Sequence, residues 1–462
     1  MNNTKIALVN PPGTYEYIRD YYTSLIAKAN YHYPPIDFVW LSASLEGPVK
    51  VFDAIAEGLS PEKLLDEAAE FAPTHIFCLV SGLSLEEDLA LIKKMKERTN
   101  AVIIAMGDIC RVAPGIIFSK SPHIDAVLRS FACTDIMGIL RNGRPAGQYP
   151  PEWVFRSGAE SACGELKKES GNIRIGVPKW EIFRLKAYKF PFALNAPVGT
   201  ILTDYGCPFK CSYCSIGTLG WRVRESDEVI DEIDLLYGLG AREIHFRDQT
   251  FGVDKERTML IMDHLKKKRL TWSCFTRMDI VSEKLLAAMK ESGCHTVIFG
   301  IESGDYELRH KYGKGIKDDI VIRTLKLCSG MNISTVGTFI IGLPGEGEKE
   351  VMKTIEFART LPLDYASFNI AVPRMGSALR SPDGEGLRTK EDPDIGYNSD
   401  AMGFMPREKA IKLASLATRR FYVRPSYIMN RLSKIRSLSV LINEFKIGHN
   451  LLFGAYSYKK KS

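Results

Sequence analysis

The chain lacks an uncharged apolar run near the roughly 20 residues that a membrane-spanning helix needs. It also lacks a tandem repeat of fixed period, a low-complexity segment and, in its first residues, the layout of a signal peptide. The composition, with 45% hydrophobic and 25% charged residues among 462, excludes a disordered chain and a collagen-like repeat. We therefore expect a soluble, cytoplasmic protein of two or three domains.

The net charge of +7 is concentrated at one end of the chain. Residues 405–462 hold 13 Lys/Arg and 2 Asp/Glu, a local +11, so the other residues together carry −4. Such a tail is most often a solvated helix face. It is alternatively a binding surface for an acidic or phosphorylated substrate, or for a membrane, because its basic residues alternate with apolar ones. The tail carries no recognisable RNA-binding motif, so we expect no nucleic-acid partner.

Two regions of alternating strand and helix signals predict an α/β fold. In residues 1–140, short apolar runs that end in turn residues alternate with amphipathic stretches, which is typical of a doubly wound parallel sheet. Ligands of such sheets lie over the carboxyl ends of the strands. Those ends are expected at Pro11–Gly13, at Ser81 and Gly82, and at Gly107 and Asp108.

The rest of the chain divides into three parts. Residues 141–195 are rich in proline and poor in periodicity, and we interpret them as a linker. Six further βα units in residues 196–375 predict a partial parallel barrel rather than one of eight units. Residues 376–462 form the basic C-terminal extension, with an amphipathic helix expected at Arg407–Tyr422.

Three of the ten cysteines, Cys207, Cys211 and Cys214, lie within eight residues and indicate a metal site. Three thiolates do not complete a structural zinc site, which takes four ligands, and the histidine nearest in sequence is His245. A four-iron cluster held by three thiolates would leave one iron free for a cofactor or substrate. A zinc-stabilised binding protein with a basic docking tail stays the alternative from a different class.

The spacing Cys-x3-Cys-x2-Cys, with Tyr213 before the last cysteine, resembles the signature of the radical S-adenosylmethionine (radical SAM) enzymes. The resemblance implies a [4Fe-4S] cluster on the three cysteines, whose unique iron chelates the amino and carboxylate groups of S-adenosylmethionine (SAM). One-electron cleavage of SAM would then give a 5′-deoxyadenosyl radical. It also implies an electron donor such as flavodoxin or ferredoxin.

The resemblance extends along residues 198–375 at the expected strand ends. It implies SAM contacts near the methionine amino group at Asp248, to the carboxylate at Arg277, and to the methionine and ribose at Glu302 and Ser303. The segment from Gly337 to Gly342 is similar to the family's adenine-binding strand. A weaker match, Pro373 to Gly376, follows the sixth strand.

A doubly wound domain before the barrel resembles the cobalamin-dependent subclass, which includes methyltransferases and the anaerobic Mg-protoporphyrin ester cyclase. This implies cobalamin over Ser81, Gly82, Gly107 and Asp108. The Asp-x-His-x-x-Gly motif is absent, which argues against a histidine ligand to cobalt. Val127–Phe131 replaces the Gly-Glu pair often found after the fifth strand, so a sheet kept only for substrate docking stays an alternative.

These observations lead to one expected function and a related alternative. We expect methylation of an unactivated carbon in a small, anionic or lipid-like biosynthetic intermediate. The alternative enzyme performs radical oxidation, cyclisation or C–C bond formation without methyl transfer. Peripheral membrane contact through the basic tail is a further expectation.

Overall fold

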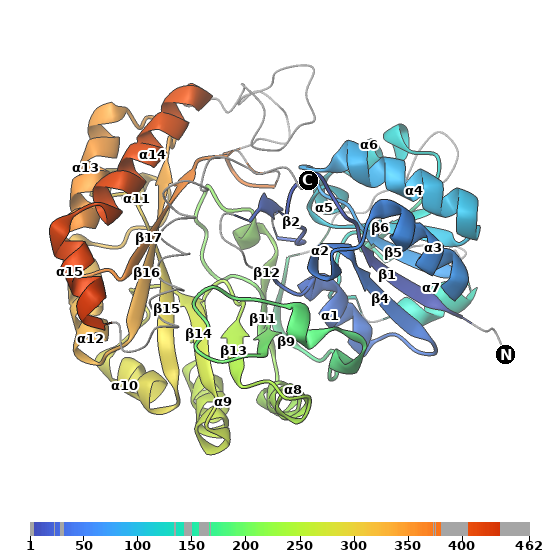
Figure 1. Ribbon diagram of the computed structural model, residues 1–462, viewed down its shortest axis with the longest axis horizontal. Coiled ribbons are helices and arrows are strands. Elements are labelled where there is room, and N and C mark those ends of the chain that lie inside the picture. The colour runs from blue at the N-terminus through green and yellow to red at the C-terminus, as the bar shows by residue number, and fades with distance from the viewer. Residues whose placement is uncertain are drawn as a thin grey trace.

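The computed structural model describes residues 4–22, 24–27, 32–133, 135–142, 150–156, 166, 168–372, 374, 376–379 and 405–434. Two β-sheets, each flanked by helices, lie side by side in this part of the chain (Figure 1). The N-terminal sheet domain and the barrel correspond to the two alternating regions that the sequence predicts. The predicted α/β fold, a doubly wound sheet followed by a six-unit partial barrel, is therefore confirmed.

The N-terminal sheet has six strands in the order β4-β1-β5-β6-β7-β8. All neighbours are parallel except β7 and β8, which are antiparallel. The strands are β1 (Ile6–Asn10), β4 (Val49–Asp53), β5 (His75–Leu79), β6 (Val102–Met106), β7 (Ala126–Leu128) and β8 (Trp153–Phe155). The other elements are β2 (Tyr17–Ile18), β3 (Leu25–Ile26), α1 (Ile36–Ala43), α2 (Ala54–Glu57), α3 (Pro61–Phe71), α4 (Leu85–Thr99), α5 (Asp108–Val112), α6 (Pro114–Lys120) and α7 (Ile136–Asn142).

The two faces of this sheet belong to different cores. Because side chains alternate along a strand, Ala7 and Val9 of β1 face one side, where they pack with residues of α3 and α4. Ile6 and Leu8 face the other side, in a core that also contains α1, α7 and the buried side chains of the barrel. The second core therefore runs through both domains without a break.

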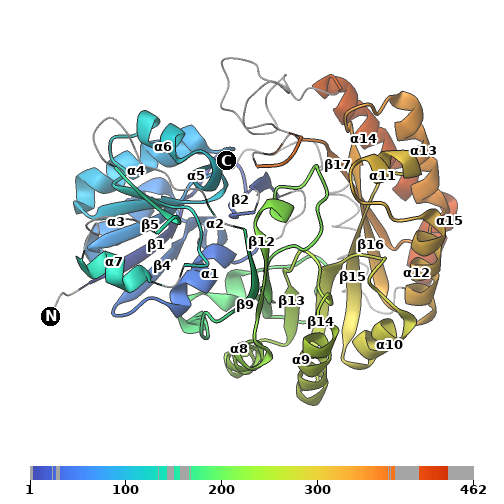
Figure 2. The same ribbon diagram turned by 180° about the vertical axis from the view of Figure 1, so that it is seen from behind.

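The barrel sheet has six parallel strands in the order β10-β13-β14-β15-β16-β17. The strands are β10 (Val198–Ile201), β13 (Glu243–Phe246), β14 (Thr271–Thr276), β15 (Cys294–Glu302), β16 (Ser334–Ile341) and β17 (Tyr365–Ile370). Helices α8 (Ser226–Gly238), α9 (Lys255–Lys268), α10 (Glu283–Glu291), α11 (Tyr306–Lys311), α12 (Asp318–Gly330) and α13 (Glu348–Thr360) connect them. These helices line the outer surface of the curved sheet (Figure 2).

The segment predicted as a linker, residues 141–195, is partly regular and corrects two predicted boundaries. Strand β8 completes the N-terminal sheet, so that domain extends past residue 140. Strand β9 (Glu169–Ile173) joins a small sheet with β11 (Asp204–Gly206) and β12 (Gly220–Arg224) of the barrel. Short 3-10 helices follow at Trp180–Ile182 and Leu185–Ala187. Strand β8 has only three residues, and β9 (Glu-Ser-Gly-Asn-Ile) lacks apolar alternation, so neither gave a sequence signal.

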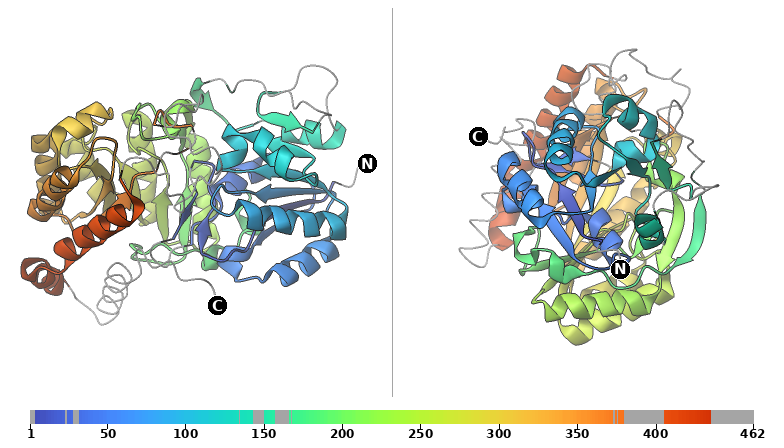
Figure 3. Two further views of the ribbon diagram at one scale, coloured as in Figure 1. Left: turned by 90° about the horizontal axis from the view of Figure 1, so that it is seen from above. Right: turned by 90° about the vertical axis from the view of Figure 1, so that its right-hand side faces the viewer.

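Two C-terminal helices cover the open edge of the barrel. Helix α14 (Arg407–Tyr422), predicted with these bounds, and α15 (Pro425–Lys434) lie on the side of the barrel away from the N-terminal domain (Figure 3). The Tyr422 hydroxyl bonds both the N–H and the carbonyl of Ala366 on the edge strand β17. Residues 435–462 of the basic tail lie outside the described residues. No described helix is long and apolar enough to cross a membrane.

A buried ion pair holds the loops at the carboxyl end of the N-terminal sheet. Arg19 bonds Asp88 at 2.7 Å, and it also donates to Asn10 and to the carbonyls of Pro11 and Pro12. We predict that Asp88→Ala destabilises the protein by about 3–5 kcal/mol, because it leaves a buried guanidinium without its counter-charge. Urea unfolding would measure this loss. The control Glu62→Ala, which removes an exposed partner of Lys94, is expected to cost less than about 1 kcal/mol. Equal losses would contradict the prediction.

Candidate functional site

The three clustered cysteines lie on a loop at the carboxyl end of the barrel sheet. The chain leaves β10, forms β11, passes through residues 207–214 and returns in β12, which pairs with β11. A loop of this kind contains little backbone pairing of its own, so it needs support from its surroundings. Two neighbouring parts of the protein supply that support.

A buried carboxylate fixes the start of the hairpin that carries this loop. Asp248, which follows β13, accepts hydrogen bonds from the Thr203 N–H at 2.6 Å, the Thr203 hydroxyl at 2.8 Å and the Asp204 N–H at 3.0 Å. Burial, with the nearby charge of Asp204, raises the pKa of Asp248 to about 7. The sequence placed Asp248 at the cofactor, but both its oxygens face the protein interior. The next residue, Gln249, faces the cleft described below.

The N-terminal domain holds both ends of the cysteine loop through one residue. The Tyr22 hydroxyl accepts a hydrogen bond from the Gly206 N–H at 3.4 Å, directly before Cys207. The Tyr22 carbonyl accepts one from the Ser215 hydroxyl at 3.2 Å, directly after Cys214. The position of the loop therefore depends on the contact between the two domains.

The three thiols face different surroundings. Cys207 Sγ lies 3.7 Å from the Thr250 hydroxyl, Cys211 Sγ accepts a hydrogen bond from Arg277 at 3.5 Å, and Cys214 lines the cleft. In the described part of the chain, no three His, Cys, Asp or Glu side chains are placed to share one metal ion. A four-iron cluster fits this donor set, because each thiolate binds a different iron.

Arg277 connects the cysteine loop to the strands behind it. Its guanidinium forms a bidentate pair with Asp279 at 2.7 and 3.0 Å and lies 3.9 Å above the ring of Phe209. It also donates to the Lys314 carbonyl at 3.0 Å. Arg277 therefore places positive charge beside Cys211. Several of its N–H donors are already bonded to Asp279 and to the Lys314 carbonyl.

Glu302 brings a carboxylate into the cleft at the end of β15. Its backbone adopts a positive φ of 70°, which is uncommon for a residue with a side chain, and its carboxylate pairs with Lys314 at 3.2 Å. A Cβ atom on Gly300 would lie 2.2 Å from Glu302 Oε1, so a larger residue there would displace the Glu302 carboxylate. Lys314 is a candidate site residue that the sequence reasoning missed, since nothing near it in the sequence marks it.

The cleft itself lies between the barrel interior and the N-terminal domain. It encloses about 1800 Å³ of empty space, including its open mouth. Tyr213, Glu302, Thr338 and Ile340 line it from the barrel, and Tyr22, Leu25 and Ile26 line it from the N-terminal domain. SAM has an aromatic base, hydroxyls and a zwitterionic end, which match aromatic, hydroxyl and charged lining groups of this kind.

Three other predicted cofactor residues support the cleft from behind. The Ser303 hydroxyl bonds Thr354 and the Asp305 N–H, and Ser303 is fully buried. A Cβ on Gly337 would lie 2.8 Å from Leu363, so this glycine allows close packing of side chains. Gly342, at φ 91°, donates its N–H to Glu346 in a tight turn. Direct SAM contacts by these residues stay predictions.

The residues predicted to carry cobalamin lie at the carboxyl end of the N-terminal sheet and bond one another. The Gly82 and Ser24 N–H groups donate to Asp108 at 3.1 and 3.2 Å, and the Ser81 N–H donates to Asp88. Gly107 has φ 131°, and a Cβ there would lie 2.3 Å from the Val80 carbonyl oxygen. Their polar groups therefore shape the loops, and their contact with a cofactor stays a prediction.

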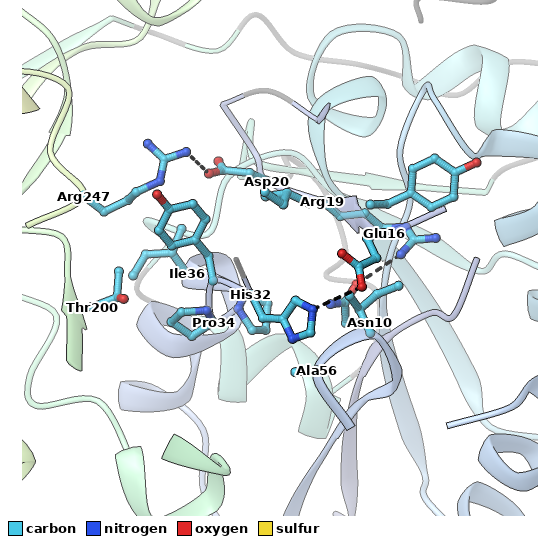
Figure 4. Close-up of a pocket in the computed structure, with 15 residues that line it drawn as sticks. Asn10, Glu16, Arg19, Asp20, His32, Pro34, Ile36, Ala56, Thr200 and Arg247 are labelled. Carbon is cyan, nitrogen blue, oxygen red and sulfur yellow. Dashed lines mark hydrogen bonds and ion pairs between the residues drawn. The ribbon is translucent and has the colours of Figure 1, made fainter. Parts of the chain in front are cut away.

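A smaller pocket of about 510 Å³ lies where β1 and β10 approach each other. Figure 4 shows Arg247 pointing toward Asp20, and His32 toward Glu16. The Arg247 guanidinium lies 3.0 Å from the Asp20 carboxylate, and the His32 ring nitrogen lies 3.4 Å from the Glu16 carboxylate. The charges drawn there are thus paired within the protein.

Comparison with known proteins shows the family of this chain. Residues 201–358 match the radical SAM superfamily profile. The chain is 30% identical over 371 residues to an uncharacterized methyltransferase of Pyrococcus horikoshii, covering 75% of this chain and 77% of that protein. It is also 30% identical over 264 residues to the cytidylyl-2-hydroxyethylphosphonate methyltransferase of Streptomyces wedmorensis, covering 52% of this chain and 47% of that enzyme.

A solved structure shares the whole fold. The radical SAM methyltransferase TsrM from Kitasatospora setae, with cobalamin and a [4Fe-4S] cluster bound, superposes with a TM-score of 0.69 at 15% identity. The match covers 98% of this chain and 99% of that one. Both the N-terminal sheet and the barrel therefore belong to one shared architecture.

We predict that anaerobic reconstitution loads about four irons per chain and that replacing Cys207, Cys211 and Cys214 with alanine abolishes this loading. Iron and zinc analysis of the purified proteins would measure both metals. Cys328→Ala is the control, since this thiol is buried on the inner face of α12, away from the cysteine loop in sequence. One zinc per chain in place of iron would contradict a cluster.

We also predict that Asp248→Ala lowers the iron content, although Asp248 faces away from the thiols. Removing the carboxylate leaves three donors without their acceptor, at a cost of about 1–3 kcal/mol each. The matched control is Ser282→Ala, which removes the side-chain N-cap of α10 and no bond to the hairpin. Full iron loading combined with weaker SAM binding in Asp248→Ala would show instead that Asp248 contacts the cofactor.

Proposed function

Because the chain belongs to the radical SAM superfamily, we propose that it is a cobalamin-dependent methyltransferase that acts on an unactivated carbon of a biosynthetic intermediate. The observation that carries this proposal is the cleft that both domains line. Tyr22, Leu25 and Ile26 border it on one side, and Cys214 and Glu302 border it on the other. The relatives that bear methyltransferase names and the whole-length likeness to TsrM support the same reading.

The lining of the cleft comes from both domains, so we assign a partner to each of its walls. We assign the cluster to the three thiols, SAM to the region of Tyr213 and Glu302, and cobalamin to the wall formed by Leu25 and Ile26. When bound, the cluster supplies one-electron cleavage of SAM, and cobalamin supplies a methyl group.

The protein's own groups orient these partners and exclude water. The Glu302–Lys314 pair presents opposite charges near the thiols, matching the two charges of an amino acid end. The aromatic rings of Phe190, Phe192 and Phe275 close the opposite end of the cleft. A dry, apolar wall of this type would protect a reactive radical from solvent.

The alternative activity is radical oxidation, cyclisation or C–C bond formation without methyl transfer. It uses the same thiols and the same SAM site and needs no second cofactor. An electron donor such as flavodoxin or ferredoxin is proposed for both activities. We propose peripheral membrane contact only through residues 435–462, which lie outside the described residues.

We predict about one corrin per chain in protein produced with cobalamin present, and we predict that Leu25→Trp lowers this content several-fold. The larger side chain would narrow the wall next to the N-terminal domain, while iron loading stays unchanged. The matched control is Leu260→Trp on the outer face of α9, where Leu260 is 55% exposed. Absorbance spectra and metal analysis would measure corrin and iron in the same samples.

Product analysis separates methyl transfer from the alternative. With reductant, SAM and candidate substrates taken from neighbouring biosynthetic genes, the proposal requires both 5′-deoxyadenosine and S-adenosylhomocysteine. Formation of 5′-deoxyadenosine alone by corrin-loaded protein would refute methyl transfer and establish the alternative.

A further inference from the structure

The charges around the cleft are unequally balanced. Among its described lining residues, Glu302 is the single carboxylate and Arg374 the single cation. Glu302 is neutralised by Lys314, which lies outside the lining. Arg374 has no ion pair or side-chain hydrogen bond within the described part of the chain. The described lining of the cleft therefore contains one positive charge without a carboxylate bonded to it.

Arg374 lies in the part of the cleft where the N-terminal domain meets the cysteine loop. It follows β17, the last barrel strand, and its charge acts on both Asp20 and Cys214. Asp20 is already paired with Arg247 at 3.0 Å. Arginines in proteins are commonly paired with a carboxylate. Arg374 has no such partner among the described residues, so its planar set of N–H donors beside the cysteine loop suits a carboxylate or phosphate.

Two other cations, Arg277 and Lys314, lie near the proposed SAM side of the cleft but outside its lining. Arg277 lies 3.5 Å from the Cys211 sulfur, and Lys314 lies beside Glu302. These two follow β14 and β15, whereas Arg374 follows β17. Arg374 thus lies at a different strand end from the two cations near the proposed SAM site. An anionic group other than the SAM carboxylate would suit it.

The floor of the cleft is apolar. Phe275, Ile298, Val336 and Tyr365 lie earlier on their strands than the residues at the carboxyl ends, so they lie deeper in the barrel. Phe190 packs against this group. A molecule that fills the cleft would thus meet apolar side chains at its depth and, among the described lining residues, one cation, Arg374.

We propose that Arg374 binds the anionic group, a carboxylate or a phosphonate or phosphate, of an amphiphilic substrate whose apolar body lies on the floor formed by Phe275, Ile298 and Val336. This inference rests on the proposed function, because it names the substrate class of the same cleft. It goes further by assigning one residue to recognition of the substrate.

A second arginine adds positive charge near the segment that carries Arg374. Arg111, on α5, is 5% exposed, its Nε has no acceptor, and no described acidic side chain pairs with it. A Cβ on Gly376, two residues after Arg374, would lie 3.2 Å from an Arg111 nitrogen. Two neighbouring arginines without carboxylate partners raise the local attraction for an anion.

Binding of simple amphiphiles to the reconstituted, SAM-loaded enzyme tests the proposal. The probes are hexylphosphonate, hexanoate, hexanol and hexylammonium, with affinities measured by calorimetry. We expect both anions to bind at least about 10-fold more tightly than hexanol and hexylammonium to bind most weakly. The advantage of the anions should shrink as salt is raised, because screening weakens charge pairing.

Variants of Arg374 assign the effect to this side chain. Arg374→Gln is expected to weaken both anions by about 10- to 100-fold and to leave hexanol unchanged. Arg374→Lys should retain part of the preference, since lysine keeps the charge without the planar fork. Arg420→Gln is the matched control, because Arg420 on α14 pairs with Glu356 on α13 at the exposed surface, outside the cleft.

Each contrary outcome has a distinct meaning. Equal affinity of the wild-type enzyme for hexanol and the two anions overturns the proposal. So does loss of SAM affinity in Arg374→Gln with the anion preference intact, which would place Arg374 in the cofactor site. Neither result depends on methyl transfer, whose failure would appear only in product analysis.

Discussion

The rest of the site depends on the hydrogen bonds that the buried carboxylate of Asp248 accepts. A loop with three thiolates has no regular structure to hold it, so its position has to come from outside. Asp248 joins the end of β13 to the hairpin that carries the loop through three hydrogen bonds. The barrel strands therefore determine where the cysteines lie, and any cluster bound there inherits that position.

The N-terminal domain supplies the second half of this constraint. Tyr22 bonds the residues before and after the cysteine loop, and the Tyr21 and Tyr205 hydroxyls bond each other at 2.7 Å across the same interface. The hydrophobic core on one face of the N-terminal sheet is continuous with the core of the barrel. An interface of this kind resists the relative motion that is usual for domains joined by polar contacts. The two walls of the cleft thus keep a defined separation.

The sequence predicted what depends on periodicity and local spacing. The six barrel strands, the bounds of α14 and the cysteine loop all follow from such signals. It did not predict β9, because that strand forms only through pairing with β12, which is distant in sequence. Nor could it decide between Asp248 and Gln249, since adjacent residues at a strand end face opposite sides and only the packed structure shows which side is the cleft. Lys314 and Arg374 could not be recognised from the sequence either, because what marks them is contact in space. Lys314 pairs with Glu302, and Arg374 has no acidic partner among the described residues.

The charge of the molecule has to be judged locally rather than in total. The net +7 comes from residues 405–462, of which 435–462 lie outside the described residues, and it says little about the cleft. Among the described residues that line the cleft, Glu302 is paired with Lys314 behind it, and Arg374 is the one remaining charge. Beside mainly apolar walls one such charge attracts an anion more strongly than a charge on the open surface, because less water surrounds it. The selectivity of this enzyme toward its substrate is therefore expected to depend on one guanidinium and on the shape of an apolar floor, and not on the basic tail.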